Sequence, residues 1–472
     1  MRIAFASLSS FPVSAWLLMA VACCSARAED AKPVQVGGRL ELLLDQGLIE
    51  SRDGVAERIF RPTPGEVVLV LDKPWEGNTS AYFTFLFDGE KYRSYYRGAH
   101  WDTATKKATH REVTCYAESR DGVHWEKPEL GLFEFDGSKQ NNIVWDGVGT
   151  HCFTPFLDRN PACPPEARFK AISRGRPQAA KGLYVFQSPD GIHWTQIQKE
   201  PVITDGAFDS QNLAFWDPQI GKYREYHRKF LGGVRAIVTS VSDDFLHWSE
   251  VLPLEYVGAP NEHLYTNAIL PHPRATHLLI GFPTRYHPNR GSQVEPLLMA
   301  SRDGQTFFRY ADAVIPVTAP QDRMGNRSNY MSWGITPVQE DDQLEAVYAT
   351  EAYYEGPDSR VRRFLYAKDR YASLHAPGKG EFTTKPLVLT GERLVVNHIT
   401  TGSLRVELLD AETGKPLAGC GAEQCEPLQG DSAKAEVRWR TGTLRAAAGK
   451  PVRLRFLLDG SDVFGFQAMD AK

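Results

Sequence analysis

Three acidic residues, Glu76, Asp209 and Glu262, stand just before segments that have the composition of β-strands. Cleavage of a glycosidic bond needs two carboxyl groups, one ionised as nucleophile or base and one protonated to supply the leaving oxygen. Neighbouring arginines would hold one acid ionised, and burial would raise the pKa of another. The three acids are therefore predicted to be the catalytic residues of a glycoside hydrolase. For each of them the alternative role is a turn cap or a structural ion pair.

Polar and charged residues gather at corresponding positions of five successive sequence units, while the middles of the strands are apolar or aromatic. These positions are the start of the first strand and the end of the second strand, which lie side by side in an antiparallel hairpin. The pattern predicts a polar substrate pocket at one edge of the fold. The predicted binding residues are Asn78, Arg97, His151, Arg174, Asn212, His227, Arg228, Tyr265, Asn267, Arg285, Asn329, Trp333 and Glu351.

Two roles are open for the arginines of this set. Guanidinium groups match the oxygens of a carboxylate or sulfate, so together they could bind an acidic sugar. Alternatively, they pair with the three acids and with Glu351. Tyr265 and Trp333 could stack on sugar rings, or pack in the core. The arginines concerned are Arg97, Arg174, Arg228 and Arg285.

A seven-residue pattern, Ser119-Arg-Asp121-Gly-Val-His-Trp125, returns three more times along the chain. Serine and aspartate accept backbone N–H bonds in a turn, and the closing aromatic ring would fill the gap between neighbouring sheets. We expect these aspartates to be structural and the repeat to indicate a radial architecture. The other copies are Ser188-Pro-Asp190-Gly-Ile-His-Trp194, Ser242-Asp-Asp244-Phe-Leu-His-Trp248 and Ser301-Arg-Asp303-Gly-Gln-Thr-Phe307.

Each repeated turn follows two extended runs joined by a polar turn, as in Tyr82 to Phe87 and Lys91 to Tyr96 around Asp88-Gly89. A fifth unit has the two extended runs, and its turn has decayed to Ala367-Lys-Asp369. The five units predict an all-β chain, a five-bladed β-propeller followed by a C-terminal β-sandwich. The predicted boundaries are residues 29–378 for the propeller and 379–472 for the sandwich. Residues 40–70 are expected to supply an outer strand that closes the ring, and a degenerate sixth blade is the alternative.

The first 28 residues have the features of an export signal, with a basic start, a short apolar run and Ala26-Arg27-Ala28 as the cleavage site. Export to the periplasm or the medium is therefore predicted, with lipid anchoring at Cys23 as the less favoured alternative. An oxidising compartment would permit disulfides. The preferred pair is Cys420 with Cys425, and the second is Cys152 with Cys163.

The 472 residues carry a formal net charge of −4 and no basic patch, which argues against nucleic acid as a partner. After the export signal, no apolar run is long enough to span a bilayer. The predicted partner is a carbohydrate substrate, and the predicted state is a monomer. No cofactor is indicated, although Asp209 and Asn212 could supply oxygen ligands to a structural Ca²⁺ on the propeller axis.

The repeated turns, the five units and the trailing sandwich together resemble the five-bladed propeller glycoside hydrolases of families 43 and 32 and their relatives. The resemblance covers roughly residues 40–472 and is closest to exported bacterial proteins labelled family-32-like. It implies that Glu76 is the nucleophile or base, that Asp209 tunes the pKa and orients the substrate, and that Glu262 is the acid. The family-32 sequence Trp-Met-Asn-Asp-Pro-Asn-Gly is absent, and Asp45 is a replacement base if the first segment folds inward.

Two other functions compete with hydrolysis. The missing family motif favours a carbohydrate-binding propeller without catalysis, and the arginines are compatible with a sialidase-like enzyme acting on acidic sugars. A separation of about 5 to 10 Å between Glu262 and either of the other two acids would fit a glycosidase pair. Ion pairs that hold all three acids to arginines would instead favour binding.

Overall fold

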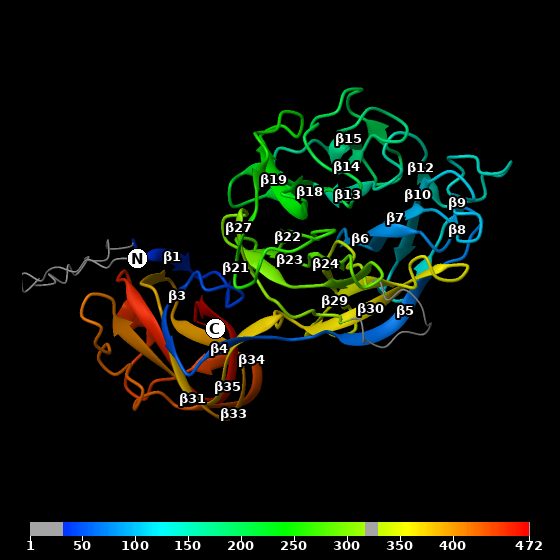
Figure 1. Cartoon of the computed structure of the whole chain (residues 1–472). Helices are drawn as coiled ribbons and strands as arrows, with labels where there is room; N and C mark the ends of the chain where they lie inside the picture. Colours follow the sequence, from blue (N-terminus) through cyan, green and yellow to red (C-terminus); the bar gives the residue numbers. More distant parts are fainter. Residues whose placement is uncertain (1–31, 317–328, 472) are drawn as a thin grey trace, which may run out of the picture.

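The computed structural model describes residues 32–316 and 329–471. The predicted export signal lies outside the described residues. Apart from two short 3₁₀ turns, η1 (Pro165–Ala167) and η2 (Leu444–Ala447), the described elements are β-strands. Figure 1 shows a ring of small sheets with a second, smaller unit at its side.

Five antiparallel sheets form the blades of a propeller, which confirms the predicted architecture. The first blade contains β6 (Ala81–Phe87), β7 (Tyr92–Gly98), β10 (Val113–Ser119) and β11 (Trp125–Glu126), with β12 (Ile143–Trp145) beside β10. The second contains β13 (Thr154–Leu157), β14 (Phe169–Arg174), β15 (Leu183–Ser188) and β16 (Thr195–Gln196). The third contains β17 (Leu213–Asp217), β18 (Lys222–Leu231), β19 (Val234–Ser242) and β20 (Leu252–Pro253).

The fourth and fifth blades depart from this regular order. The fourth contains β22 (Leu270–Pro271), β23 (Leu279–Gly281), β26 (Met299–Ser301) and β27 (Thr306–Arg309), and β21 (Glu255–Val257) lies parallel to β27. The fifth contains β28 (Thr336–Pro337), β29 (Leu344–Glu351), β30 (Ser359–Ala367) and β5 (Thr63–Leu71). Two small hairpins extend from the blades, β8 (Trp101–Asp102) with β9 (Lys107–Ala108), and β24 (Thr284–His287) with β25 (Gln293–Pro296).

Strand β5 closes the ring. It precedes the first blade in sequence, yet it pairs antiparallel with β30 as the outermost strand of the fifth blade. The expected closure is thus made by residues 63–71, at the end of the predicted segment 40–70, and it removes the open sheet edge that β30 would otherwise present. The segment does not form a sixth blade.

The second unit is built on three long strands, β31 (Ala372–Thr384), β33 (Arg393–Asp410) and β35 (Val452–Met469). Register irregularities in β33, at 397/398 and between 400 and 403, let the sheet bend so that its two halves enclose an apolar core. This is the C-terminal sandwich. Its other strands are β1 (Val34–Gly37), β2 (Glu41–Leu42), β3 (Ile49–Asp53), β4 (Ala56–Ile59), β32 (Leu387–Leu389) and β34 (Leu428–Val437).

Strands from both ends of the chain contribute to this second unit. The predicted boundary assigned residues 29–378 to the propeller, whereas the pairing places β1 to β4 and all of β31 in the C-terminal sheet. Alternating apolar residues predict that a segment is a strand, but they do not specify which sheet it joins.

The repeated turns have the predicted structural role. In the third copy, one carboxylate oxygen of Asp244 accepts the backbone N–H groups of Leu246 and His247 at 2.9 and 2.8 Å, and the other lies 2.6 Å from the His247 ring. The Ser242 hydroxyl donates to the same carboxylate and accepts the N–H of Phe245. The carboxylate of one aspartate therefore connects residues on both sides of the turn by hydrogen bonds.

Replacing Asp244 with alanine is expected to lower the free energy of unfolding by about 1–2 kcal/mol, because two backbone N–H groups lose their acceptor. Urea unfolding would measure the change. Asp243 is the matched control, since it lies in the same turn and pairs with Lys222 at the surface. Asp243→Ala should change stability by less than about 0.5 kcal/mol; equal losses in the two variants would contradict the capping role.

The repeated turns also join neighbouring blades. Arg93 and Tyr95 on β7 donate hydrogen bonds to the carbonyl oxygens of Asp190 and Gly191 in the turn of the second blade, at 2.8 and 3.0 Å. The Trp194 ring of that turn packs edge-on against Tyr95, with ring centres 6.2 Å apart. The aromatic ring thus fills the gap between two blades, as predicted. Corresponding bonds run from Arg224 and Tyr226 to Asp303 and Gly304.

The two predicted disulfides are wrong, because all five described cysteines are free thiols. Cys152 precedes β13 and lies beside Asn212, whereas Cys163 lies beyond the far end of this strand, next to Lys170. In the second unit, the Sγ of Cys420 faces the Thr443 carbonyl and that of Cys425 accepts the N–H of Val406, so each thiol packs separately in the core. The fifth cysteine, Cys115, is also buried.

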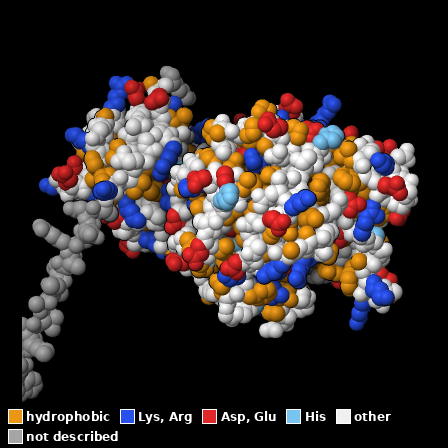
Figure 2. Space-filling view, turned by 90° about the horizontal axis from the view of Figure 1, so that it is seen from above, with side chains coloured by type: hydrophobic (Ala, Val, Ile, Leu, Met, Phe, Trp, Pro, Cys, Tyr) orange, Lys and Arg blue, Asp and Glu red, His pale blue; other side chains and the backbone are white. Residues whose placement is uncertain are grey.

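Acidic and basic side chains are mixed over both units on the face shown in Figure 2. In the described part of the chain, no helix has the length and apolar character needed to cross a bilayer.

Candidate functional site

A pocket of 470 Å³ opens at one edge of the second and third blades, where their second strands end and their third strands begin. This is the edge at which the sequence predicts substrate binding. Asp209, from the loop before β17, lies in its wall, and the aromatic rings of Phe230 and Tyr265 line it as well. The remaining lining side chains include Arg174, Arg176, Lys181, Phe208, Arg228 and Arg235.

Asp209 presents an ionised carboxylate to this pocket. Its Oδ1 lies 2.9 Å from His151 Nε2, in a hydrogen bond, and 2.8 Å from Arg174 Nη1, in an ion pair, and its side chain is 58% exposed. The bond from His151, with the charges of Arg174 and Arg228, holds the pKa of Asp209 well below its usual range although burial opposes this. Among the described residues, no side chain or backbone group donates to Oδ2. This oxygen is therefore available to a ligand.

His151 joins Asp209 to a second carboxylate, that of Glu112. The Nδ1 of His151 lies 2.9 Å from Glu112 Oε2, so both ring nitrogens face carboxylate oxygens. Burial raises the pKa of Glu112, but the bond to His151 and the charge of Arg97 outweigh it and bring this pKa to about 2. Two hydrogen bonds of 2.9 Å across one imidazole place the two carboxylates roughly 7 Å apart, within the span of inverting glycosidase pairs.

Arg97 fixes the far side of this group. Its guanidinium donates to the Thr79 carbonyl at 2.7 Å and to the Tyr353 hydroxyl at 3.1 Å, and it lies 4.9 Å from the centre of the Tyr82 ring. Tyr82 has a φ of 59°, in the left-handed region that residues other than glycine rarely adopt. Such strain is typical of sites where the surrounding structure imposes a precise side-chain position, and here it turns the ring towards Arg97 and His151.

Glu76 lies elsewhere. It is 2% exposed, accepts the Tyr96 hydroxyl at 2.7 Å and forms an ion pair with Lys127 at 2.6 Å. Lys127 directly follows β11, the outermost strand of the first blade, so Glu76 faces the outer part of this blade. These contacts correspond to the alternative of a structural ion pair.

Glu262 is also held by the outer part of its blade. It pairs with Arg309 on β27 and lies 3.6 Å from Arg285, which in turn pairs with Glu295 at 2.6 Å. None of these partners lines the pocket of Asp209. Of the three predicted catalytic acids, the pocket therefore contains Asp209, and the assignments of Glu76 and Glu262 remain predictions without support from their contacts.

The other predicted binding residues divide between the pocket and the framework. Arg97, His151, Arg174, Arg228 and Tyr265 lie in or beside the pocket. His227 is fully buried behind it, between Glu225 and the Asp205 carbonyl. Framework hydrogen bonds or ion pairs hold Asn78 to Trp101, Asn212 to Phe208, Asn267 to Tyr226, Asn329 to Pro316, Glu351 to Arg362 and Trp333 to Ile269. Asp45 binds Arg302.

Three residues in or beside the pocket were absent from the prediction, and they share one position. Glu112, Lys181 and Arg235 stand at or next to the start of a third strand, namely β10, β15 and β19. Third strands run antiparallel to second strands, so their starts lie at the same edge as the predicted positions. A search that included third-strand starts would have found all three.

The surroundings of Asp209 do not suit the predicted Ca²⁺. Its partners are the His151 ring and the Arg174 guanidinium, and the amide of Asn212 donates to the Phe208 and Ser210 carbonyls. A second cation beside them would be repelled. Structural Ca²⁺ thus remains a prediction that these contacts do not support.

A different group of potential metal ligands, His272, Glu345 and Asp369, lies buried beneath the junction of the two units. The Nδ1 of His272 accepts the backbone N–H of Ala275 at 3.1 Å, so the ring proton of the neutral imidazole is on Nε2. This nitrogen faces Asp369 at 3.6 Å and cannot bind a metal while it carries a proton. The group is therefore a buried polar network, closed on one side by the ion pair of Arg274 with Asp369.

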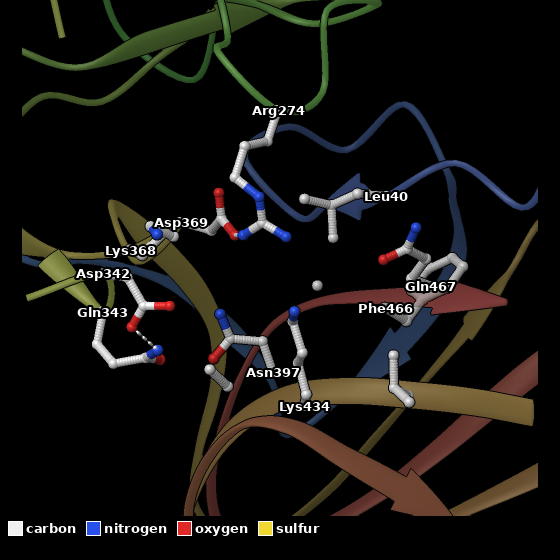
Figure 3. Close-up of a pocket in the computed structure, with 13 residues that line it drawn as sticks. Leu40, Arg274, Asp342, Gln343, Lys368, Asp369, Asn397, Lys434, Phe466 and Gln467 are labelled. Carbon is white, nitrogen blue, oxygen red and sulfur yellow. Dashed lines mark hydrogen bonds and ion pairs between the residues drawn. The ribbon is translucent and has the colours of Figure 1, made fainter. Parts of the chain in front are cut away.

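This network borders a cavity of 160 Å³ between the propeller and the sandwich (Figure 3). Arg274 reaches into it from the fourth blade and meets Asp369, while Lys434 and Asn397 approach from the second unit. A larger cavity of 660 Å³ lies where the first strands end, at the opposite end of the axis, and its walls are mainly apolar. Neither cavity contains the carboxylate pair.

No protein-family model matches the sequence. Over 144 residues the chain is 31% identical to uncharacterized protein Rv1502 of Mycobacterium tuberculosis strain H37Rv, and over 151 residues it is 30% identical to uncharacterized protein MT1551 of strain CDC 1551. Each match covers 30% of this chain and 40% of the relative. The chain therefore spans less than half the length of the curated relatives it matches.

Solved structures with a similar chain path include a β-1,2-mannobiose phosphorylase from Listeria innocua, at a TM-score of 0.46 and 12% identity over 63% of this chain and 94% of that one. An endo-1,4-β-xylanase from Bacteroides thetaiotaomicron matches at 0.43 and 15% identity over 63% and 96%. An N-acetylgalactosamine deacetylase from F. plautii matches at 0.43 and 11% identity over 68% and 97%. The function proposed below rests on the site residues.

Proposed function

We propose that this protein is a carbohydrate-active propeller that hydrolyses a glycosidic bond in the pocket around Asp209. The observation that carries the proposal is the carboxylate–imidazole–carboxylate group of Asp209, His151 and Glu112, whose Asp209 lines this pocket. The resemblance of the repeated turns to propeller glycoside hydrolases supports the same reaction class. We therefore move the proposed carboxylate pair from Glu76 and Glu262 to Asp209 and Glu112.

Each member of this group has a role in the proposed hydrolysis. The bond from the anomeric carbon to the leaving oxygen breaks, and this oxygen takes a proton that His151 supplies through Glu112. A water molecule adds its oxygen to the anomeric carbon and passes a proton to Asp209. The hydrogen bond between Asp209 and His151 then returns this proton to the imidazole. Tyr265 and the exposed ring of Phe230 offer apolar faces for the sugar.

A binding protein without catalysis is the second candidate, and the ion pairs favour it. Glu76 is held by Lys127, Glu262 by arginines, and Asp209 by Arg174 and His151. The pKa values of Asp209 and Glu112 are both lowered, so that neither carboxyl group is protonated in the free protein. Such a protein would hold a glycan at the same pocket and release no product.

A screen of the purified protein against neutral, sulfated and uronic-acid glycans distinguishes these functions. We expect new reducing ends from at least one glycan class, and none from the same protein carrying His151→Gln, which removes the proton donor. A thermal shift without product, on prolonged incubation with the same glycan, would establish the binding protein instead.

A further inference from the structure

The walls of the pocket carry far more positive than negative charge. Among the described lining residues, Asp209 supplies a carboxylate, and its Oδ1 is already occupied by His151 and Arg174. Opposing it are five cationic side chains from the second and third blades. These are Arg174, Arg176, Lys181, Arg228 and Arg235.

Arg228 is the most unusual of these cations. It is 5% exposed, and its Nε and Nη1 have no hydrogen-bond acceptor among the described residues. Its guanidinium lies 4.7 Å from the centre of the Tyr265 ring and 5.6 Å from that of Phe230. Aromatic faces attract a cation without neutralising it. Asp209 is near enough for the charge of Arg228 to lower its pKa, but no carboxylate of the described residues forms an ion pair with Arg228. A buried guanidinium without an ion pair is costly to the fold, so its retention calls for a partner that arrives with the ligand.

Arg235 lies beside Arg228 and repeats this arrangement. Its Nε also has no acceptor among the described residues, and its guanidinium stands 5.4 Å from the Phe230 ring and 5.8 Å from the Tyr265 ring. The two arginines thus share the same pair of aromatic rings. Arg235 and Phe230 face each other across β18 and β19, which fixes the spacing of the two cations.

The other three arginines of the predicted set have acidic partners. Arg97 lies 3.5 Å from Glu112, Arg174 lies 2.8 Å from Asp209, and Arg285 lies 2.6 Å from Glu295. The sequence left two roles open for these arginines, pairing with acidic residues or binding an anionic sugar. The arginines with acidic partners have the first role, and the second remains open for Arg228. Arg228 and Arg235 have no ion pair with an acidic residue in the described part of the chain. Beside them, the half-exposed ring of Phe230 provides a flat apolar face at the rim of the pocket.

We propose that the pocket binds a carbohydrate that carries a carboxylate or sulfate group, and that Arg228 and Arg235 bind this group. The inference rests on the proposed function, because it takes a glycan as the ligand of the pocket. Guanidinium forks match the oxygens of either anion, and the adjacent rings hold the apolar face of the sugar. The anion supplies the missing counter-charge for Arg228, so neutral glycans bind more weakly.

Matched ligand pairs test this assignment. Uronate oligosaccharides are compared with their carboxyl-reduced forms, and sulfated oligosaccharides with their desulfated forms, by titration calorimetry at pH 7 and fixed salt. We expect the charged member of at least one pair to bind at least tenfold more tightly than its neutral counterpart. Inorganic phosphate and inorganic sulfate are titrated alone as further probes.

Two variants and a control locate the effect. Arg228→Met is expected to bring the charged-to-neutral affinity ratio close to one, and to raise the melting temperature of the free protein because an unpaired buried charge is removed. Arg235→Gln should lower the ratio several-fold and provides the test if Arg228→Met does not fold. Lys229→Met is the control, because Lys229 is the next residue of β18 and pairs with Asp205 at the surface; it should leave the ratio unchanged.

Two results would overturn the inference and leave the proposed hydrolysis intact: equal binding of charged and neutral members, or hydrolysis of a neutral glycan without preference for charge. Inorganic phosphate could also bind in a way that depends on Arg228, without preference for any charged glycan. This result would show that the site binds a free inorganic anion, and it would also overturn the inference. If no glycan of any class binds, both this inference and the proposed function fail.

Discussion

Asp209→Asn is expected to reduce glycoside hydrolysis by about 10³-fold or more while the protein remains folded, because the amide can neither carry the charge nor accept the proton of water. The side chain is 58% exposed and its neighbours keep their other contacts, so the melting temperature should change little. Turnover is measured on the glycan identified by the screen, with circular dichroism as the check on folding.

Asp205 provides a close control for this experiment. It lies in the same loop, is 63% exposed, and pairs with Lys229 at 2.6 Å away from the carboxylate–imidazole group. Asp205→Asn should keep full turnover. Activity of Asp209→Asn at the level of this control would exclude Asp209 as a catalytic residue and favour the binding protein.

Glu345→Gln is expected to remove a large pH dependence of stability. Burial raises the pKa of Glu345 to about 7 from an ordinary value of 4.5. Between pH 4.5 and 7 the unfolded chain releases this proton while the folded protein keeps it, so the free energy of unfolding falls as pH rises. The loss reaches roughly 3 kcal/mol above pH 7. Charged and titratable groups around Glu345 are His272, Arg274, Lys368, Asp369 and Tyr371.

Urea unfolding at pH 5 and pH 8 tests this expectation. The variant should resemble the unmodified protein at pH 5 and be more stable than it at pH 8, since glutamine keeps the oxygen that accepts the Asp369 N–H. Glu340→Gln, at an exposed position of the same blade, serves as the control and should reproduce the unmodified pH dependence. A Glu345→Gln protein with the same loss of stability between pH 5 and 8 would contradict the raised pKa.

Local chemistry explains why the architecture could be predicted from the sequence. The Ser-x-Asp turns contain their own hydrogen bonds, within six residues, so each copy shows a turn wherever it occurs. Four copies at blade-sized intervals, with hairpins before them, were enough to predict five blades. The closing strand, residues 63–71, falls largely within the segment 40–70 that was expected to close the ring.

The site was only partly predictable, because its members are chosen by contacts that are distant in sequence. Glu76 and Asp209 occupy similar positions before a first strand, but Lys127, 51 residues later, draws Glu76 into an outer ion pair. His151 and Arg174 hold Asp209 at the pocket instead. Residues in the loops before strands do not follow the alternation of side-chain direction within strands. Their sequence position alone therefore could not distinguish the two acids.

The return of both chain ends to the sandwich also decides how the two units are tethered. The chain passes from β4 of the sandwich to β5 of the propeller, and later from β30 back to β31. These two crossings lie side by side, because β4 pairs with β31 and the N–H of Phe60 bonds to the Tyr371 carbonyl at 2.8 Å. The tether is thus a two-stranded ribbon, which resists twisting far more than one flexible linker. A protease that cuts one crossing leaves the units covalently joined through the other.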